Sequence, residues 1–349
     1  MPVGKDADDL NLKEVKDDPA PFYPRVGGRH ALLPLHRSLY ASRFLCGEDA
    51  LTGRSFSHRR QWMLERLQLL TETFAIELCA YALMSNHYHV VVKIDAERAS
   101  QWSAHEVVAR WTRLYSGPPY AQRFLAGEPL AEFERSLLER DIAKWRARLV
   151  DLSWFMRCLN EWLARRANEE DACKGRFWEG RFKSQALLDE TAVLTAMVYV
   201  DLNPVRAGIA EAPIDSDFTS VQQHLFEIAR SQAHDEPITP RLLPFIGALR
   251  NDSEDGLPFN LQDYLSLVDT SGRIVRSDKR GAIPNDIPAL LATLGIQADE
   301  WFATVTQLQA RFELFVGAPY RLRQIAERRG WRWVRGLAAG RKLYARANE

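Results

Sequence analysis

The sequence predicts an α+β protein in which an antiparallel sheet is combined with many helices. Two apolar segments, Ile76–Leu83 and His87–Ile94, have the length of strands and are separated by a turn at Met84–Asn86. Residues 57–74 carry apolar side chains at helical spacing, and residues 100–170 are mostly helical in pattern. With 349 residues, 46% of them hydrophobic, the chain is long enough for a large core and two or three domains.

The first part of the chain predicts a flexible leader, one strand and one helix. Residues 1–28 are rich in aspartate and proline, which disfavours packing, and their polar start lacks a signal-peptide pattern. A strand is expected at His30–Leu39, although Pro34 is unfavourable within it. The helix at residues 57–74 has its apolar positions at Trp62, Met63, Leu67, Leu70 and Phe74.

The second strand of the predicted hairpin begins with two histidines separated by one residue. Because successive strand side chains point to opposite faces, His87 and His89 face the same way and Tyr88 faces the other. Two imidazoles on one rigid face can bind a divalent metal. The alternative is a pair of ordinary histidines at a strand edge, and this motif alone supports both interpretations about equally.

A further helix is predicted after Asp189, which is a suitable N-cap, and Pro204 and Gly208 are its stop signals. Tyr199 and Asn203 are four residues apart, so they share one helical face. The phenol could serve as a nucleophile and the amide as a third metal ligand. The alternative is a core tyrosine followed by an asparagine that ends the helix.

Two basic segments could contact nucleic acid, since cations neutralise phosphates and aromatic rings stack on bases. The first is the loop GRFWEGRFKS at residues 175–184, which follows a predicted helix around Leu152–Asn168; its aromatic rings are expected to be half buried and its cations exposed. The second is the segment 320–349, which holds nine lysines and arginines against two acids, interleaved with Trp331, Trp333 and Tyr344. The alternative for this segment is a solvated amphipathic helix.

The remaining sequence bounds the architecture and the cellular setting. Residues 216–310 predict a linker and accessory helices, and further helices are expected at Asp299–Phe315 and Tyr320–Arg329. The formal charge is zero, so net charge gives no indication of nucleic-acid binding. Four cysteines without a CxxC pair fit a reducing compartment, and no apolar run reaches membrane-spanning length. A cytoplasmic protein without membrane association is therefore expected.

Several of these segments together resemble the single-tyrosine HUH transposases, and most closely the REP-associated tyrosine transposases of bacteria. The His-hydrophobe-His motif of that family matches His87-Tyr88-His89 within YALMSNHYHVVV, and its tyrosine helix matches YVDLNPVRAG from Tyr199 to Gly208. The segments GRFWEGRFKS and RFLCG, the latter at Arg43–Gly47, also match. The resemblance covers roughly residues 30–215.

The resemblance implies a ferredoxin-like (RRM-like) antiparallel sheet with helices, a helical insertion at about 100–170 and a helical C-terminal region. It divides the chain into a flexible acidic leader at 1–28, a catalytic domain at 29–215 and an accessory helical region with a basic C-terminus at 216–349. Tyr199 would be the catalytic nucleophile. His87, His89 and Asn203 would hold Mg²⁺ or Mn²⁺. The residues expected to bind nucleic acid are Arg176, Trp178, Arg181, Lys183, Arg206, Arg328, Arg329, Arg332 and Arg335.

The activity implied by the resemblance is that of a single-stranded DNA transposase or endonuclease. It would cleave and rejoin DNA near short hairpins, such as REP palindromes, through a covalent 5′-phosphotyrosine, and it would be associated with the nucleoid. The protein is expected to be a monomer or a homodimer, and its long inserts favour the monomer. The alternatives are a non-catalytic regulator that binds DNA hairpins on the same fold, a phosphodiesterase that uses water, and an RNA-binding module.

Overall fold

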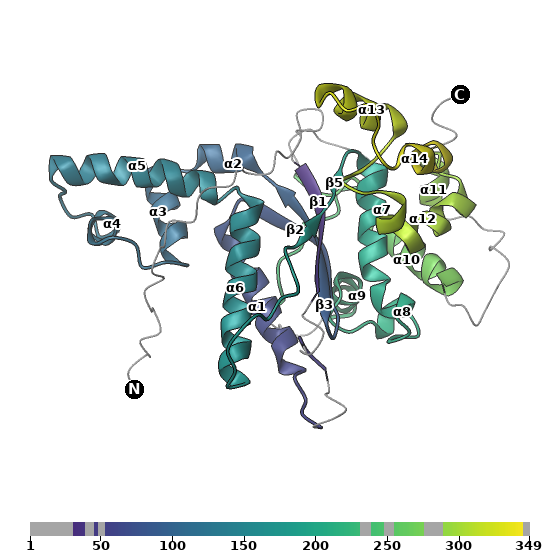
Figure 1. The fold of residues 1–349 in the computed structure, drawn as a ribbon, viewed down its shortest axis with the longest axis horizontal. Helices are drawn as coiled ribbons and strands as arrows, with labels where there is room; N and C mark the ends of the chain where they lie inside the picture. The colour runs from purple at the N-terminus through teal and green to yellow at the C-terminus, as the bar shows by residue number, and fades with distance from the viewer. Residues whose placement is uncertain are drawn as a thin grey trace.

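The computed structural model describes residues 31–38, 45–47, 53–230, 239–247, 255–275 and 289–344. The leader predicted at 1–28 lies outside these residues. The described chain is a mixed α and β protein, as the sequence predicted, with a sheet at its centre (Figure 1). Within the described ranges, no helix combines the length and the hydropathy needed to cross a membrane.

In the described residues the sheet contains six strands and runs in the order β2-β3-β1-β5-β6, with β4 also paired to β1. The pairings of β1, β2 and β3 are antiparallel, whereas β5 pairs with β6 in parallel. The strands are β1 (Ala31–Ser38), β2 (Ile76–Leu83), β3 (His87–Ile94), β4 (Lys183–Ser184), β5 (Ala186–Leu187) and β6 (Phe315–Val316). The bounds of β2 and β3 confirm the predicted hairpin, and β1 confirms the predicted strand despite Pro34.

Helices cover both faces of the sheet (Figure 1). On one face lie α1 (His58–Thr73) and α6 (Leu152–Glu170), and the Tyr88 hydroxyl of β3 donates to Asn160 Oδ1 of α6 at 2.8 Å. On the other face lies α7 (Glu190–Asp201), whose Tyr199 ring contacts His89 of β3. The alternation of side chains along β3 therefore directs Tyr88 to one helical layer and both histidines to the other.

Between β3 and α6, residues 96–148 form an arm of four helices at the left of Figure 1. These four are α2 (Ala96–Gln101), α3 (Ala104–Thr112), α4 (Pro119–Leu125) and α5 (Glu132–Arg148). Stacked indole rings hold the arm together, because Trp111 and Trp145 lie 5.6 Å apart between ring centroids at 8°. Both tryptophans are buried core residues of the arm.

The second half of the described chain packs beside α7 (Figure 1). Its helices are α8 (Asn203–Arg206), a short 3-10 helix (Pro213–Asp215), α9 (Ser220–Arg230), α10 (Leu261–Val275), α11 (Ala289–Thr293), α12 (Ala298–Arg311), α13 (Pro319–Arg328) and α14 (Leu337–Leu343). Both α10 and α12 contact α7 directly, so the described parts of residues 216–310 include packed helices as well as connections. The division of the chain into domains stays a prediction.

One predicted helix is shorter than its pattern indicated. The helix expected at Asp299–Phe315 ends at Arg311, because Phe312 adopts an extended backbone conformation with φ −124° and ψ 152°. Phe315 then pairs with Ala186 as the first residue of β6. The apolar pattern in the sequence continues past the end of the helix because Phe312 and Phe315 are both buried. A buried apolar residue fits a short strand as well as a helix, so the pattern did not show where the helix ends.

Candidate active site

The histidine pair lies on the face of β3 that meets α7. The ring centroids of His87 and His89 are 5.0 Å apart and their planes are nearly perpendicular, at 86°. His89 is 4% exposed, and His87 is partly exposed at the first position of the strand. The two imidazoles are therefore close enough to bind one ion together, as the spacing in the sequence predicted.

The turn before His87 is anchored by residues 45–47, which sequence analysis assigned only by resemblance. The backbone amides of Leu45 and Cys46 both donate to the Ser85 carbonyl at 3.0 Å. The Cys46 thiol donates to the Met84 carbonyl at 2.9 Å, and burial raises the pKa of this thiol to about 11. Cys46 is therefore a buried hydrogen-bond donor that fixes the approach to the histidines.

Asn86 fixes the orientation of the first imidazole. Its Oδ1 lies 2.6 Å from His87 Nδ1, and because a carboxamide oxygen can only accept, Nδ1 carries the proton. Nε2 is then the nitrogen suited to a metal, which is the usual arrangement for a histidine ligand oriented by its second nitrogen. Burial also lowers the pKa of His87, which favours the neutral form that ligation requires.

Tyr199 reaches the histidines from α7. Its ring centroid lies 5.8 Å from that of His89, with an interplanar angle of 85°, and its side chain is 7% exposed. The helix begins where the sequence predicted, because the Asp189 side chain accepts the Ala192 amide at 2.9 Å as an N-cap. This cap sets the helical register that brings Tyr199 to His89.

Asn203 and Arg206 continue the face of the helix that carries Tyr199, at the spacing i, i+4 and i+7. The guanidinium carbon of Arg206 lies 4.3 Å from the centre of the Tyr199 ring. Asn203 Nδ2 donates to the carbonyls of Tyr199 at 3.0 Å and Val200 at 3.3 Å. The bond to Val200 takes the place of the one that Pro204, which has no backbone N–H, cannot make.

The donors present fit a divalent metal of the kind that the sequence suggested. His87 and His89 can supply imidazole nitrogen, and the Asn203 carboxamide can supply oxygen because its NH₂ group is already directed to the helix. Such donors leave coordination positions open for phosphate oxygens, and oxygen ligands are those that Mg²⁺ and Mn²⁺ prefer. His87 and His89 are therefore placed to share an ion, and the role of Asn203 as a third ligand stays a prediction.

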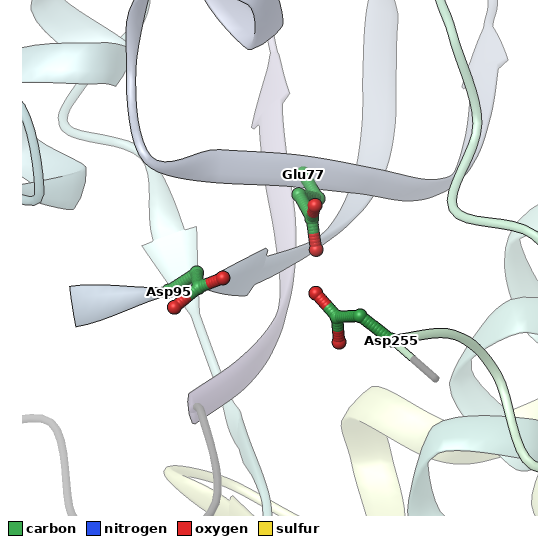
Figure 2. A group of neighbouring side chains, drawn as sticks. All are labelled: Glu77, Asp95 and Asp255. Carbon is green, nitrogen blue, oxygen red and sulfur yellow. The ribbon is translucent and has the colours of Figure 1, made fainter. Parts of the chain in front are cut away.

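A second group of potential ligands, Glu77, Asp95 and Asp255, lies at the other end of the hairpin (Figure 2). Protein cations already balance these carboxylates. Lys93 Nζ lies 3.3 Å from Glu77 Oε2 and also pairs with Asp255, while Arg98 Nη1 donates to Glu77 at 2.9 Å. Asp95 caps α2 by accepting the Arg98 amide. This cluster is an ion-pair network that ties residue 255 to the sheet.

The basic loop at 175–184 exposes its cations and buries most of its rings. Arg176, Arg181 and Lys183 are exposed, as expected. Trp178 is only 6% exposed, and its indole Nε1 donates to the Asn160 carbonyl at 2.9 Å. Its ring also packs edge-on against Tyr88. The prediction that Trp178 contacts nucleic acid is therefore wrong, because no ring face is available for a base; Trp178 joins the loop to α6.

In the C-terminal basic segment, three arginines and the indole ring of Trp333 are exposed. Arg328, Arg332 and Arg335 are exposed, and Trp333 is 69% exposed. Arg329 differs, because it is partly buried and its guanidinium stacks on Phe315 and Trp331 at 5.3 and 5.1 Å. The exposed members of this group have the chemistry for phosphate and base contacts.

Two carboxylates at the ends of α7 connect it to the second half of the chain: the partly buried N-cap Asp189 and the buried Asp201, which sequence analysis did not assign. Asp189 Oδ2 accepts the Ala318 amide at 2.7 Å, and its Oδ1 accepts the Tyr344 hydroxyl at 2.6 Å. Asp201, fully buried, accepts the Ser220 hydroxyl at 2.5 Å, the Val221 amide at 3.0 Å and the Tyr264 hydroxyl at 2.5 Å. The signal for Asp201 was a lone acid within an apolar helix, which requires buried partners.

Comparison with solved structures finds one described as a REP-associated tyrosine transposase bound to a REP hairpin. The match covers 64% of this chain and 99% of that chain, with 13% sequence identity and a TM-score of 0.34. No protein-family model and no curated protein matches the chain.

Proposed function

We propose that this protein is a metal-dependent DNA strand transferase of the single-tyrosine HUH kind, which cleaves and rejoins single-stranded DNA near short hairpins. The observation that carries the proposal is the meeting of His87 and His89, from one strand face, with Tyr199 from α7. A metal-binding pair beside a phenol is the constellation needed for phosphoryl transfer to tyrosine.

The arrangement of strands supports the same proposal. We interpret the order β2-β3-β1-β5, with α1 between β1 and β2 in the chain, as a ferredoxin-like core. In this interpretation β6 extends the core by one strand, and α2–α5 are an insertion between β3 and α6. The histidines then lie on a central strand, β3, where the neighbouring strands on both sides restrict their movement.

The proposed reaction is a transesterification at phosphorus. The Tyr199 oxygen forms a bond to the scissile phosphorus and the P–O3′ bond breaks. The phenol loses its proton, and the departing 3′ oxygen gains one. The products are a 5′-phosphotyrosine and a free 3′-OH. When bound, Mg²⁺ or Mn²⁺ supplies Lewis-acid polarisation of the phosphate. Because the phosphotyrosine conserves the ester, a 3′-OH can attack it and rejoin DNA without an external energy source.

The exposed cations supply surfaces for the DNA. Arg176, Arg181 and Lys183 line one loop, and Lys183 is the first residue of β4, which pairs with β1 beside β3. The other surface comprises Arg328, Arg332 and Arg335 with Trp333, and it is joined to the start of α7 through Asp189. A folded hairpin and a flanking single strand would each require such a phosphate-neutralising surface.

The experiment that tests the proposal is a covalent-adduct assay on a denaturing gel. The protein is incubated with a library of single-stranded hairpin oligonucleotides and Mn²⁺ or Mg²⁺. We expect a shifted band that requires the metal, disappears in Tyr199→Phe and persists in Tyr120→Phe, whose phenol bonds to Asp141 in the helical arm. Cleavage without an adduct would instead indicate a hydrolytic nuclease. Hairpin binding without cleavage would indicate the non-catalytic regulator.

The metal site can be tested without turnover. Titration of the protein with Mn²⁺, followed by electron paramagnetic resonance of the free ion, should show one site that is lost in His89→Ala. The control is His105→Ala, since His105 lies on α3 in the arm and packs against Phe124. Equal Mn²⁺ binding by wild type and His89→Ala would contradict the proposed ligand set.

A further inference from the structure

Arg206 lies directly against the proposed nucleophile. Its guanidinium carbon is 4.3 Å from the centre of the Tyr199 ring, while the edge-to-face contact with His89 involves the same ring at 5.8 Å between centroids. The phenol is thus in contact with a permanent cation as well as with a proposed metal ligand. Sequence analysis assigned Arg206 only to general DNA binding, without a contact to Tyr199.

Local backbone structure fixes this position. The helix α7 ends at Asp201, and the single turn α8 continues the same direction, because the Arg206 amide donates to the Leu202 carbonyl at 2.9 Å. The Asn203 side chain closes the junction by donating to the carbonyls of Tyr199 and Val200. The arginine therefore extends the face that carries Tyr199, with little freedom to move independently of it.

One nitrogen of the Arg206 guanidinium lacks a hydrogen-bond acceptor among the described residues. Arg206 Nη1 is buried, and within the described part of the chain it has no hydrogen-bond partner. A buried charged donor without an acceptor costs more free energy than a buried neutral one. Such groups are few in native proteins, and a catalytic role is one of the explanations for them. An acceptor that arrives with the substrate would satisfy this nitrogen.

We propose that Arg206 is a catalytic residue that binds a non-bridging oxygen of the scissile phosphate and stabilises the negative charge of the reaction at Tyr199. This inference rests on the proposed function and assigns a role within that site. As the Tyr199 oxygen bonds to phosphorus and the P–O3′ bond breaks, charge accumulates on the non-bridging oxygens, where a guanidinium N–H can accept part of it through a charge-assisted hydrogen bond. In the rejoining direction the phenolate leaves, and the stacked cation stabilises it.

The test compares Arg206→Gln and Arg206→Lys with wild type in single-turnover adduct formation and, separately, in hairpin binding measured by fluorescence anisotropy in EDTA. We expect Arg206→Gln to lower the adduct rate about 100-fold, the size of effect seen for a lost transition-state donor. Metal-free hairpin affinity should fall much less than the adduct rate, because most phosphate contacts lie elsewhere. Arg206→Lys should recover part of the rate, because the positive charge remains. The matched control is Arg148→Gln, which removes another stacked arginine, 4.0 Å from the Trp154 ring on the opposite face of the sheet.

A second substrate makes the assignment specific to phosphate charge. Replacing one non-bridging oxygen of the scissile phosphate by a methyl group removes the charge that Arg206 would neutralise. The ratio of the wild-type rate to the Arg206→Gln rate should then fall from about 100 towards unity. If the glutamine only loosens α8, this ratio of rates stays the same for the two substrates. A loosened helix would slow adduct formation equally on both of them.

The outcomes separate the two proposals. If wild type forms no adduct with any hairpin substrate, the proposed function fails and the role of Arg206 fails with it. If wild type forms the adduct and Arg206→Gln does so at the same rate, the inference alone is overturned. A rate and a hairpin affinity that fall in the same proportion would also overturn it, because Arg206 would then be an ordinary DNA contact.

Discussion

The substitution Tyr264→Phe tests whether the buried Asp201 cluster holds α7 in place. The Tyr264 hydroxyl donates to Asp201 Oδ2, while Oδ1 receives the Ser220 hydroxyl and the Val221 amide. Removing the hydroxyl deprives Oδ2 of its donor inside a fully buried cluster but leaves the ring volume unchanged. A hydrogen bond to a charged group contributes about 1.5–3 kcal/mol, so the free energy of unfolding should fall by about 2 kcal/mol.

Urea unfolding followed by circular dichroism measures this loss. With a slope of about 3 kcal/mol/M, the midpoint should fall by about 0.7 M. Tyr120→Phe is the control, because it also removes a phenol bonded to a carboxylate, Asp141, but at a partly exposed position where a smaller loss is expected. If Tyr264→Phe costs no more than Tyr120→Phe, the Asp201 cluster does not hold α7.

The loss of unfolding free energy caused by Tyr264→Phe should also depend on pH, and its direction can be worked out. Burial raises the pKa of Asp201 above its ordinary value, so the folded state binds more protons than the unfolded state, and this group's contribution to stability falls as pH rises above that value. The Tyr264 hydroxyl opposes this effect because it favours the ionised carboxylate. The cost of Tyr264→Phe should therefore be larger at about pH 8 than at about pH 5. A cost that is larger at the acid value would refute the reasoning.

Three further predictions concern other parts of the molecule. Trp333→Ala should weaken hairpin binding by about 1–3 kcal/mol, measured by anisotropy, if its exposed ring stacks on a base; unchanged affinity would contradict this. Iodoacetamide should modify the partly exposed Cys173 at neutral pH before Cys46, whose labelling by mass spectrometry should rise with pH towards its pKa of about 11; equal labelling would be inconsistent with the burial described. Gly336→Ala should lower the urea stability by about 3 kcal/mol, because Gly336 has φ +105° and an added Cβ would lie 2.4 Å from Phe312; a neutral effect would contradict this packing.

Local sequence patterns predicted the elements that carry the site. The strand bounds at His87–Ile94 and the cap at Asp189 are correct because each depends on neighbouring residues, namely an apolar run after a turn and an acid before a helix. The shared face of His87 and His89 follows from the strand period alone. Their proximity to Tyr199 came from the resemblance, since no local pattern states which helix packs on which strand face.

The features that could not be predicted depend on contacts between distant segments. The strands β5 and β6 contain two residues each and have no periodicity to detect. Burial of Trp178 depends on its bond to Asn160 on α6, a contact between distant segments, whereas the composition of the loop indicated only half-buried rings. The stacking of Arg206 on Tyr199 was implicit in the spacing of seven residues, but the intervening proline obscured whether the helical direction would continue.

The attachment of Asp189 to Ala318 and Tyr344 has a consequence for chain synthesis. The helix that carries Tyr199 acquires its complete set of bonds at its first turn only after the segment near residue 344 has left the ribosome. The sheet closes equally late, because β1 pairs with β5, and β5 pairs with a strand at residues 315–316. Contacts of such long range slow folding. We therefore expect a chain truncated before residue 315 to hold Tyr199 less rigidly, so that adduct formation at the proposed site would require the segment up to residue 344.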